Sequence, residues 1–365
     1  MKILIPILGF GNSGGNRVLS KLADELILLG NDVTFLCPDC SDLPYFPTNA
    51  NIIWAGKSGK INGLKSYKKK KVNFLGVQFK LWITLLRLRP KAYDVYIANH
   101  SLTTYPLKFS ALAGKTLYYV QAYEPDYFEL LPGIKNKVFK LLSEFSYKMN
   151  FFTVVNAEKY QLYKKLNSKR VLYPGVDFSI FHPISETKKG EQIILGTVGR
   201  KEHFKGTPTI IEAFNQLKKK YSNIKLIVAF GDPADFADYN DVFCIRPEND
   251  IQLALFYQSL DYYICAMYSQ LDTFHYPVVE AMSCGVSLIT TSFYPANPEN
   301  AWIIKPQNAE NLIVKFEEAQ NELKKKKEKI SQALKDVKQF HWKNVGEKMN
   351  SYLNEFLMTT RKKLK

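Results

Sequence analysis

MKILIPILGFGNSGGNRVLSKLADELILLGNDVTFLCP, residues 1–38, is the stretch that decides the fold. It begins with an apolar run and passes through a glycine-rich turn. Apolar residues then recur at helical spacing, at Val18, Leu22, Leu26 and Leu29. A second apolar run closes the stretch. A strand, a turn, a helix and a strand in this order predict a parallel α/β unit.

The same alternation continues through the first half of the chain and restarts in the second half. In the first half, strands are predicted at 93–100, 115–123, 151–157 and 169–177, and an apolar helix at 74–88. A polar segment without periodicity, at 179–192, then predicts a linker. In the second half, strands are predicted at 193–200, 224–232, 261–268 and 286–291, and helices at 207–221, 251–260 and 309–330. Two consecutive α/β halves that face each other across a cleft would hold a ligand at the carboxyl ends of their strands.

Composition limits the class of protein. The 365 residues are 46% hydrophobic and 14% aromatic, which excludes global disorder. The net charge of +16 favours anionic partners such as phosphate-bearing substrates, a membrane surface or nucleic acid. No pattern typical of a nucleic-acid-binding motif supports the last of these.

Segments that target or anchor a chain are not predicted. Residues 1–10 read as a strand and a loop, not as an export signal. No apolar run reaches about 18 residues, and the richest stretch, 75–89, is interrupted by Lys80 and Arg87. We therefore expect a cytoplasmic chain that lies on the inner face of the membrane without spanning it.

The five cysteines do not predict a disulfide framework or a zinc site. Cys37 and Cys40 form a CPDC sequence, but the remaining cysteines supply no second pair. We interpret CPDC as a strand end followed by a turn, with reduced thiols.

Two glycine-containing loops follow predicted strands. GFGNSGG, residues 9–15, is either a ligand-binding loop at a helix N-terminus or a tight turn, and it lacks the end of a Walker A motif. GRKEHFKG, residues 199–206, places Arg200 and Lys205 where they would neutralise a diphosphate. A solvated basic loop is the alternative interpretation of the second loop.

The segment DTFHYPVVE, residues 272–280, contains two carboxylates. Pro277 favours a helix start, so Glu280 is expected in the first turn and Asp272 in the preceding loop. Carboxylates there would accept hydrogen bonds from ribose or sugar hydroxyls. The alternative is that they only compensate the helix dipole.

These pieces together resemble the retaining glycosyltransferases of the GT-B fold, family 4 (group 1 glycosyltransferases). The resemblance is carried by GTVGRKEHFKGTPTIIEAF, LALFYQSLDYYI and DTFHYPVVEAMSCGVSLITT, and more loosely by LYPGVDFSIFHP and FHWKNVGEKMNSYL. YYVQAYEPDYF is similar to a subgroup with bacterial rhamnosyltransferases. The resemblance implies two Rossmann-like domains. Residues 1–178 would bind the acceptor, 179–344 would bind the nucleotide sugar, and a helix of about 345–365 would pack back on the first domain.

The resemblance also implies roles for residues of the second domain. Arg200 and Lys205 would bind the diphosphate and act in catalysis, next to Gly199, and Glu280 would hold the ribose. Asp272 would contact the donor sugar, although most members have the longer Glu at this position. Thr273 and His275 replace two glycines that many members have in this loop, so the donor would differ.

In the first domain, the resemblance implies a catalytic position for His100 near the sugar, and donor binding at Gly14 and Gly15. The donor would be a nucleotide-diphosphate sugar and the acceptor a glycan or a lipid-linked glycan of the bacterial surface. No Asp-x-Asp motif separates the halves, so neither a metal nor another cofactor is expected. A sugar-nucleotide epimerase and a non-catalytic partner subunit of a glycosyltransferase remain alternatives.

Seven lysines lie between Lys57 and Lys71, next to an apolar helix that contains Phe74, Phe79 and Trp82. A basic and apolar segment of this kind favours an anionic membrane surface. The alternative is a solvated loop beside a core helix.

Overall fold

The computed structural model describes residues 1–57, 59, 61–62, 73–88, 92–166, 168–184, 190–199 and 203–363. The chain divides into two compact units. Unit 1 comprises Met1–Gly175 and Trp342–Lys365, and unit 2 comprises Val176–His341. The sequence placed the two boundaries at 178/179 and 344/345. Each unit is described by itself below.

Unit 1 is built on one seven-stranded sheet in the order β4-β3-β2-β1-β5-β6-β7. The strands are β1 Lys2–Pro6, β2 Asp32–Pro38, β3 Asn51–Ala55, β4 Ile61–Asn62, β5 Val95–Ala98, β6 Thr116–Val120 and β7 Phe152–Val155. All neighbours are parallel except β3 and β4. Every residue of β5 and β6 is buried, as expected for central strands that helices cover on both faces.

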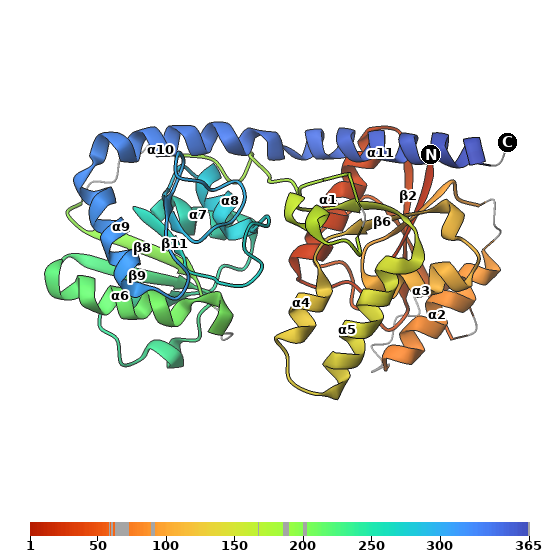
Figure 1. The fold of residues 1–365 in the computed structure, drawn as a ribbon, viewed down its shortest axis with the longest axis horizontal. Coiled ribbons are helices and arrows are strands. Elements are labelled where there is room, and N and C mark those ends of the chain that lie inside the picture. The colour runs from red at the N-terminus through yellow and green to blue at the C-terminus, as the bar shows by residue number, and fades with distance from the viewer. Residues whose placement is uncertain are drawn as a thin grey trace. The chain divides into compact units, whose positions relative to one another are not determined.

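The helices of unit 1 come from both ends of the chain. They are α1 Gly14–Leu28, α2 Phe74–Arg87, α3 Ser101–Phe109, α4 Glu124–Glu129, α5 Ile134–Ser146 and α11 Trp342–Lys363. Helix α11 lies along α1 (Figure 1). The approach is so close that a Cβ atom at Gly346 would lie 2.6 Å from the Cβ of Glu25. Asn31 also donates to the Asn350 side chain at 3.1 Å.

Unit 2 is built on a six-stranded, fully parallel sheet in the order β10-β9-β8-β11-β12-β13. The strands are β8 Ile193–Val198, β9 Ile224–Ala229, β10 Val242–Ile245, β11 Tyr262–Cys265, β12 Ser287–Thr290 and β13 Trp302–Ile303. The helices are α6 Thr207–Lys220, α7 Asp250–Ser259, α8 Tyr276–Ser283, α9 Ala309–Asn321 and α10 Leu323–Asp336. The expectation of two Rossmann-like units is confirmed.

Two predicted elements are wrong. Residues 169–177 form no strand, only two isolated bridges, from Val171 to Val155 and from Val176 to His341. Pro174, between them, lacks the N–H group that a longer ladder needs. The predicted helix at 309–330 is two helices that part at Glu322. They part because α9 packs on α6 and on the sheet edge, whereas α10 packs on α8.

Each sheet has one point where the chain changes its direction of winding. In unit 1, the strands β1 to β3 extend one way and β5 to β7 the other, so this switch point lies between β1 and β5. In unit 2 it lies between β8 and β11. The loops that leave two such neighbouring strands diverge and leave room for a ligand at the carboxyl edge. Functional residues are therefore expected in the loops after β1 and β5, and after β8 and β11.

Candidate functional site

The switch point of unit 2 brings together two loops that are far apart in the sequence. One follows β8 and leads through a short 3-10 turn, η5 (His203–Lys205), into α6. The other follows β11 and leads into α8. They touch at Gly206, which has φ +78°, and a Cβ atom there would lie 2.1 Å from the carbonyl oxygen of Ala266. Only glycine permits this backbone conformation together with this close approach.

Lys205 lies at this junction. Its Nζ is 3.5 Å from the sulfur of Met267, directly after β11, and 5.3 Å from the ring centre of Phe204. The side chain is half-buried. Burial raises the pKa of the Cys265 thiol, and the positive charge of Lys205 is one of the influences that lower it. The predicted cation therefore lies beside the end of β11, in the loop that follows β8.

The two helices that start here differ from the other helices that follow strands in unit 2. Helices α6 and α8 begin with no side-chain cap and no acidic residue in the first turn. In contrast, α7 is capped by Asn249 and continues with Asp250, and α9 is capped by Asn308, with Glu310 in its first turn. The positive ends of α6 and α8 are thus left without a carboxylate, which is the arrangement that accepts an anion.

Gly199 follows β8 directly and has a packing role. A Cβ atom at this position would lie 2.3 Å from Cγ1 of Val228 on the neighbouring strand β9. Arg200, the residue predicted to bind the diphosphate beside Lys205, lies outside the described residues, so its role stays a prediction.

Asp272 is exposed and has a left-handed backbone with φ +60°. Its amide donates to the carbonyl oxygen of Ser292 at 2.8 Å, and its carboxylate accepts a hydrogen bond from the hydroxyl of Ser292. Thr273 donates to the carbonyl oxygen of Gln270 at 2.6 Å and closes the turn. The loop is therefore held by its own side chains and by the segment after β12.

Glu280 is not in the first turn of its helix, and that expectation is wrong. Helix α8 begins at Tyr276, so Glu280 is its fifth residue, and it is 2% exposed. Its Oε2 accepts a hydrogen bond from the Tyr257 hydroxyl at 3.0 Å. Burial and the adjacent Glu280 carboxylate hold the pKa of Tyr257 well above its ordinary value, so the phenol stays protonated as the donor.

His275 occupies the N-cap position of α8. Its ring stacks on Phe293 with centroids 4.7 Å apart and an interplanar angle of 28°. Its Nδ1 lies 3.9 Å from the sulfur of Cys265. An imidazole thus fills the space between the end of β11 and the loop after β12, at the start of an uncapped helix.

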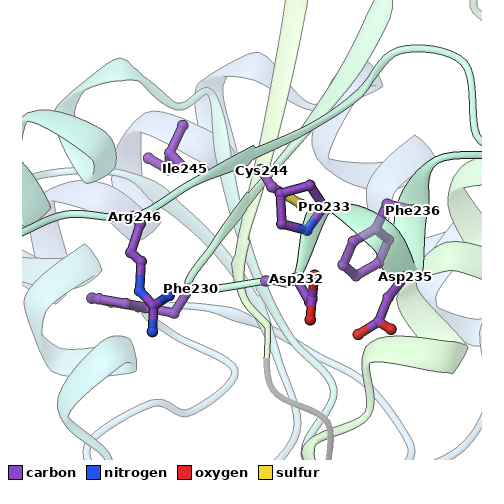
Figure 2. Close-up of a pocket in the computed structure, with 9 residues that line it drawn as sticks. Phe230, Asp232, Pro233, Asp235, Phe236, Cys244, Ile245 and Arg246 are labelled. Atoms are coloured by element: carbon purple, nitrogen blue, oxygen red, sulfur yellow. The ribbon is translucent and has the colours of Figure 1, made fainter.

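A pocket that sequence reasoning missed lies at the carboxyl ends of β9 and β10 (Figure 2). Its volume is about 400 Å³. It is lined by Phe230, Gly231, Asp232, Pro233, Asp235, Phe236, Cys244, Ile245 and Arg246. Phe230 and Arg246 both contribute to its wall (Figure 2). Because β9 is the neighbour of β8, the pocket belongs to the same edge of the sheet as Lys205.

In unit 1, Gly14 and Gly15 are the first two residues of α1. The cap is Ser13, whose hydroxyl accepts from the amide of Asn16 at 3.4 Å. A Cβ atom at Gly15 would lie 3.5 Å from Oε1 of Gln121, which follows β6. The glycines therefore stand at a helix N-terminus on the carboxyl edge, and this placement is compatible with both sequence interpretations of the loop.

His100 follows β5 and caps α3 with its side chain. Its Nδ1 accepts from the amide of Leu102 at 3.1 Å and lies 3.4 Å from a carboxylate oxygen of Glu124. Glu124 in turn accepts from the amide of Ser101 at 3.0 Å. In the neutral ring, the proton is therefore on Nε2. Sequence reasoning missed Glu124, although EPD after a predicted strand is a typical helix start.

The structure thus places the predicted residues at the two switch points. Gly199, Lys205, Asp272 and Glu280 lie at or just behind the β8/β11 edge of unit 2. Gly14, Gly15 and His100 lie at the β1/β5 edge of unit 1. Within the described residues, no cluster of three or more His, Cys, Asp or Glu side chains could hold a metal ion. Among the same residues, no helix combines the length and apolarity that a membrane span needs.

Comparisons with known proteins agree with this geometry. Residues 180–337 match the family model described as glycosyl transferases group 1. The fold matches that of sucrose-phosphate synthase from Thermosynechococcus elongatus, with a TM-score of 0.77, 14% identity and coverage of 98% of this chain and 100% of that one.

Two further structures match with similar TM-scores. The Anabaena protein Alr3699/HepE, in complex with UDP and glucose, has a TM-score of 0.72 and 15% identity, over 97% of this chain and 99% of that one. WaaG, a glycosyltransferase involved in lipopolysaccharide biosynthesis, has a TM-score of 0.70 and 16% identity, over 96% and 99%. No curated protein sequence matches the chain. Unit 2 therefore contains the segment that matches the group 1 glycosyl transferase model, and the chain has the GT-B fold.

Proposed function

We propose that this chain is a retaining glycosyltransferase of family 4 that takes a sugar from a nucleoside-diphosphate sugar. One observation carries the proposal. At the β8/β11 switch point, the uncapped starts of α6 and α8 leave two positive helix ends near the Lys205 ammonium group. A diphosphate is the ligand that such an edge is suited to bind.

The remaining parts of the donor fit the neighbouring features. The pocket after β9 and β10 offers the flat groups of Phe230 and Arg246, which suit stacking with a nucleobase. Glu280 would accept from the ribose hydroxyls, with its carboxylate oriented by the Tyr257 hydroxyl. Arg200, from the sequence, would add a second cation to the diphosphate.

In the proposed reaction, the bond between the sugar and the phosphate breaks and negative charge grows on the leaving oxygen. Lys205 and the two helix ends stabilise that charge, which is electrostatic catalysis by groups already in place. The acceptor oxygen then bonds to the anomeric carbon on the face from which the diphosphate leaves, and the leaving phosphate takes the acceptor's proton. Attack on that face retains the configuration. Asp272 and His100 would orient the sugar. The cations would replace a metal, so we propose metal independence.

The proposal extends to the donor and the acceptor. HepE was solved with UDP-glucose, so UDP-sugars are the first donors to try. YYVQAYEPDYF is similar to the subgroup with rhamnosyltransferases, so dTDP-linked and GDP-linked deoxysugars follow. We propose that the acceptor is a glycan or lipid-linked glycan of a bacterial cell surface, met by a cytoplasmic chain in peripheral contact with the membrane through the Lys57–Lys71 segment.

A thermal-shift panel of UDP, GDP, dTDP and their sugars tests the proposal. A nucleotide at about one hundred times its dissociation constant adds roughly 2.7 kcal/mol to the free energy of unfolding. Lys205→Ala should abolish most of this gain. Lys219→Ala is the matched control, because Lys219 is exposed at the opposite end of α6. The proposal fails if no nucleotide stabilises the wild type, or if the two variants respond alike.

Transfer itself is then followed with the donor that binds. The anomeric configuration of the product, read by proton NMR, tests retention. Activity that disappears in EDTA and returns with a divalent ion would contradict metal independence. Isomerised donor without an acceptor would identify an epimerase, and binding without any turnover would favour a non-catalytic subunit.

A further inference from the structure

The pocket at the carboxyl ends of β9 and β10 contains opposite charges that do not pair with each other. Within the described residues, the Arg246 guanidinium forms no ion pair and the Asp235 carboxylate accepts no hydrogen bond. Figure 2 shows the carboxylates of Asp232 and Asp235 apart from the guanidinium. Charged groups in a pocket that lack protein partners are available to a ligand.

The carboxylates of the pocket lie near its wall at β10. Asp232 and Asp235 come from the short 3-10 turn after β9, η6 (Pro233–Phe236), and from its cap. Burial raises the pKa of the Cys244 thiol, and the negative charges of Asp232 and Asp235 raise it further. The thiol therefore stays protonated at neutral pH. The negative charge of the pocket belongs to the two carboxylates.

The rest of the described lining offers no amide or hydroxyl side chain. Apart from the two carboxylates, the guanidinium and the thiol, it consists of Phe230, Gly231, Pro233, Phe236 and Ile245. The strong side-chain acceptors among these lining residues are thus both carboxylates. A carboxylate only accepts hydrogen bonds, so a ligand suited to this part of the pocket presents N–H donors.

Phe230 is held in an uncommon conformation at this pocket. Its ring is 40% exposed, and its φ of +63° is one that bulky residues rarely adopt. Its amide donates to the carbonyl oxygen of Ile245 at 2.8 Å, which fixes the turn. With Arg246, the ring supplies flat groups on which a base stacks, and a two-ring purine covers more of such a surface than a pyrimidine does.

The common nucleobases differ in the donors that they present to a carboxylate. Guanine has two adjacent donors, N1–H and the 2-amino group, which match the two oxygens of one carboxylate. Adenine and cytosine each have one amino group next to a ring nitrogen that accepts. Uracil and thymine have one N–H group between two carbonyl oxygens, which a carboxylate repels.

We infer that this pocket selects guanine, so that the donor is a GDP-linked sugar. The base stacks on Phe230 and Arg246, and its N1–H and 2-amino groups donate to Asp232 and Asp235. The inference deepens the proposed function and rests on it, since it names the base of the same nucleotide. Uracil and thymine fit these residues less well, because their carbonyl oxygens would face two negative charges.

The first test compares the affinities of GDP, UDP, dTDP, ADP and CDP by isothermal titration calorimetry. We expect GDP to bind about tenfold more tightly than each of the others, which is within the discrimination of a bidentate contact to a base. Any of the other four that binds as tightly as GDP overturns the inference.

The second test separates the carboxylate contact from stacking. Inosine diphosphate differs from GDP only in lacking the 2-amino group, so its stacking area is nearly the same. We expect the wild type to bind it about tenfold more weakly than GDP, since a hydrogen bond to a charged group is lost. The double variant Asp232→Asn and Asp235→Asn should lose most of this difference.

The double variant is expected to keep the fold. Both side chains are exposed, and the Asp232 oxygen that accepts from the amide of Ala234 at 3.2 Å is retained in asparagine. An unchanged midpoint of thermal unfolding without nucleotide checks this. Asp238→Asn is the matched control, because Asp238 is exposed in the same segment but does not line the pocket. An unchanged preference for GDP in the double variant, or an equal loss in the control, overturns the inference.

The inference and the proposed function fail in different ways. A chain that binds UDP or dTDP most tightly retains the proposed donor site and loses only the choice of guanine. A chain that binds none of the nucleotides overturns both. Lys205→Ala should weaken GDP and UDP alike, because the diphosphate is common to them, whereas the double variant should weaken GDP and not UDP.

Discussion

Unit 1 and unit 2 share one architecture but differ in what they expose. Both are parallel sheets covered by helices, and both have a switch point at the carboxyl edge. In unit 2, that edge carries two uncapped helix starts, Lys205 and a pocket. In unit 1, α1 and α3 are capped by Ser13 and His100, and α2 and α5 expose large apolar side chains such as Leu75 and Ile134. The architecture therefore places the loops, whereas a few side chains decide which ligand each unit suits.

The interiors differ as well. A stack of tyrosines fills part of unit 1, with Tyr123 4.1 Å from Tyr163 and 5.4 Å from Tyr147, and Tyr118 5.9 Å from Tyr147, between ring centroids. In unit 2, burial also raises the pKa of Tyr257 and Tyr262, whose ring contacts are tilted or edge-on and not stacked. The two interiors should therefore respond differently to alkali.

The largest expected effect is alkaline unfolding of unit 1 before unit 2. Burial raises the pKa to about 12 at Tyr96, Tyr105, Tyr123 and Tyr160. Because the folded pKa exceeds the unfolded value of about 10, the stabilisation is complete below pH 10 and is lost as the pH rises through about 12. An alkali-active protease and mass spectrometry would locate the first cuts between pH 9 and 11.5. First cuts in 176–341 would contradict the comparison.

Lys205→Ala should have the largest effect on activity. Loss of one preorganised charge stabiliser typically lowers turnover by about 10² to 10³, or about 2.7–4 kcal/mol. Steady-state transfer kinetics would measure it, with Lys219→Ala expected to match the wild type. If His100→Ala in unit 1 lowers turnover more than Lys205→Ala does, the chemistry is not centred on unit 2.

Gly206→Ala should destabilise unit 2 by about 2–4 kcal/mol, since a left-handed non-glycine backbone and an overpacked contact add. The contact is the 2.1 Å approach of the new Cβ atom to the Ala266 carbonyl oxygen. Urea unfolding would measure the change. Gly190→Ala is the control, because a Cβ atom there meets nothing within 4 Å. Equal stability of the two variants would mean that the loops after β8 and β11 do not touch as described.

The smallest expected effect separates a charged hydrogen-bond acceptor from a neutral one. Tyr257→Phe in unit 2 removes the donor to the Glu280 carboxylate. Tyr119→Phe in unit 1 removes the donor to the Leu172 carbonyl, at 3.0 Å. Bonds to charged groups contribute about 1.5–3 kcal/mol and neutral bonds about 0.5–1.5. In urea unfolding, Tyr257→Phe should lower the free energy of unfolding more than Tyr119→Phe does. The reverse order would argue against a charged acceptor at Glu280.

Much of the fold followed from local pattern. The strand at 115–123 and the helix at 74–88 correspond to β6 and α2 because each contains a long apolar segment of the length typical of its element. Strand β10 was missed because the short apolar run Val242–Ile245 lies within a polar segment, DYNDVFCIRPEND. The pocket of Phe230 and Arg246 was missed with it. The break between α9 and α10 was missed because a helical period continues across Glu322, and only the packing partners change.

The candidate site was predictable in part for a similar reason. A cation such as Lys205 in a glycine-containing loop after a strand is a local signal. The partners of Glu280 and His100 are not local. Tyr257 is 23 residues from Glu280 and lies on another helix, and Glu124 follows the strand after that of His100. Hydrophobic periodicity predicts which face of an element is buried, but not which side chain of another element packs against that face.

By itself, the sequence determined the order of strands and helices, the glycine-rich turns between them and the basic charge, because each depends on residues within one turn or one strand. Only the tertiary structure decided that β8 pairs with β11, although β9 and β10 lie between them in the sequence. That pairing puts Lys205 beside Met267 and two uncapped helix starts on one edge. The same holds for the pocket of Phe230 and Arg246, whose walls come from the segment after β9 and from the end of β10. Non-local packing decides such features, since which faces meet depends on the arrangement of all elements together.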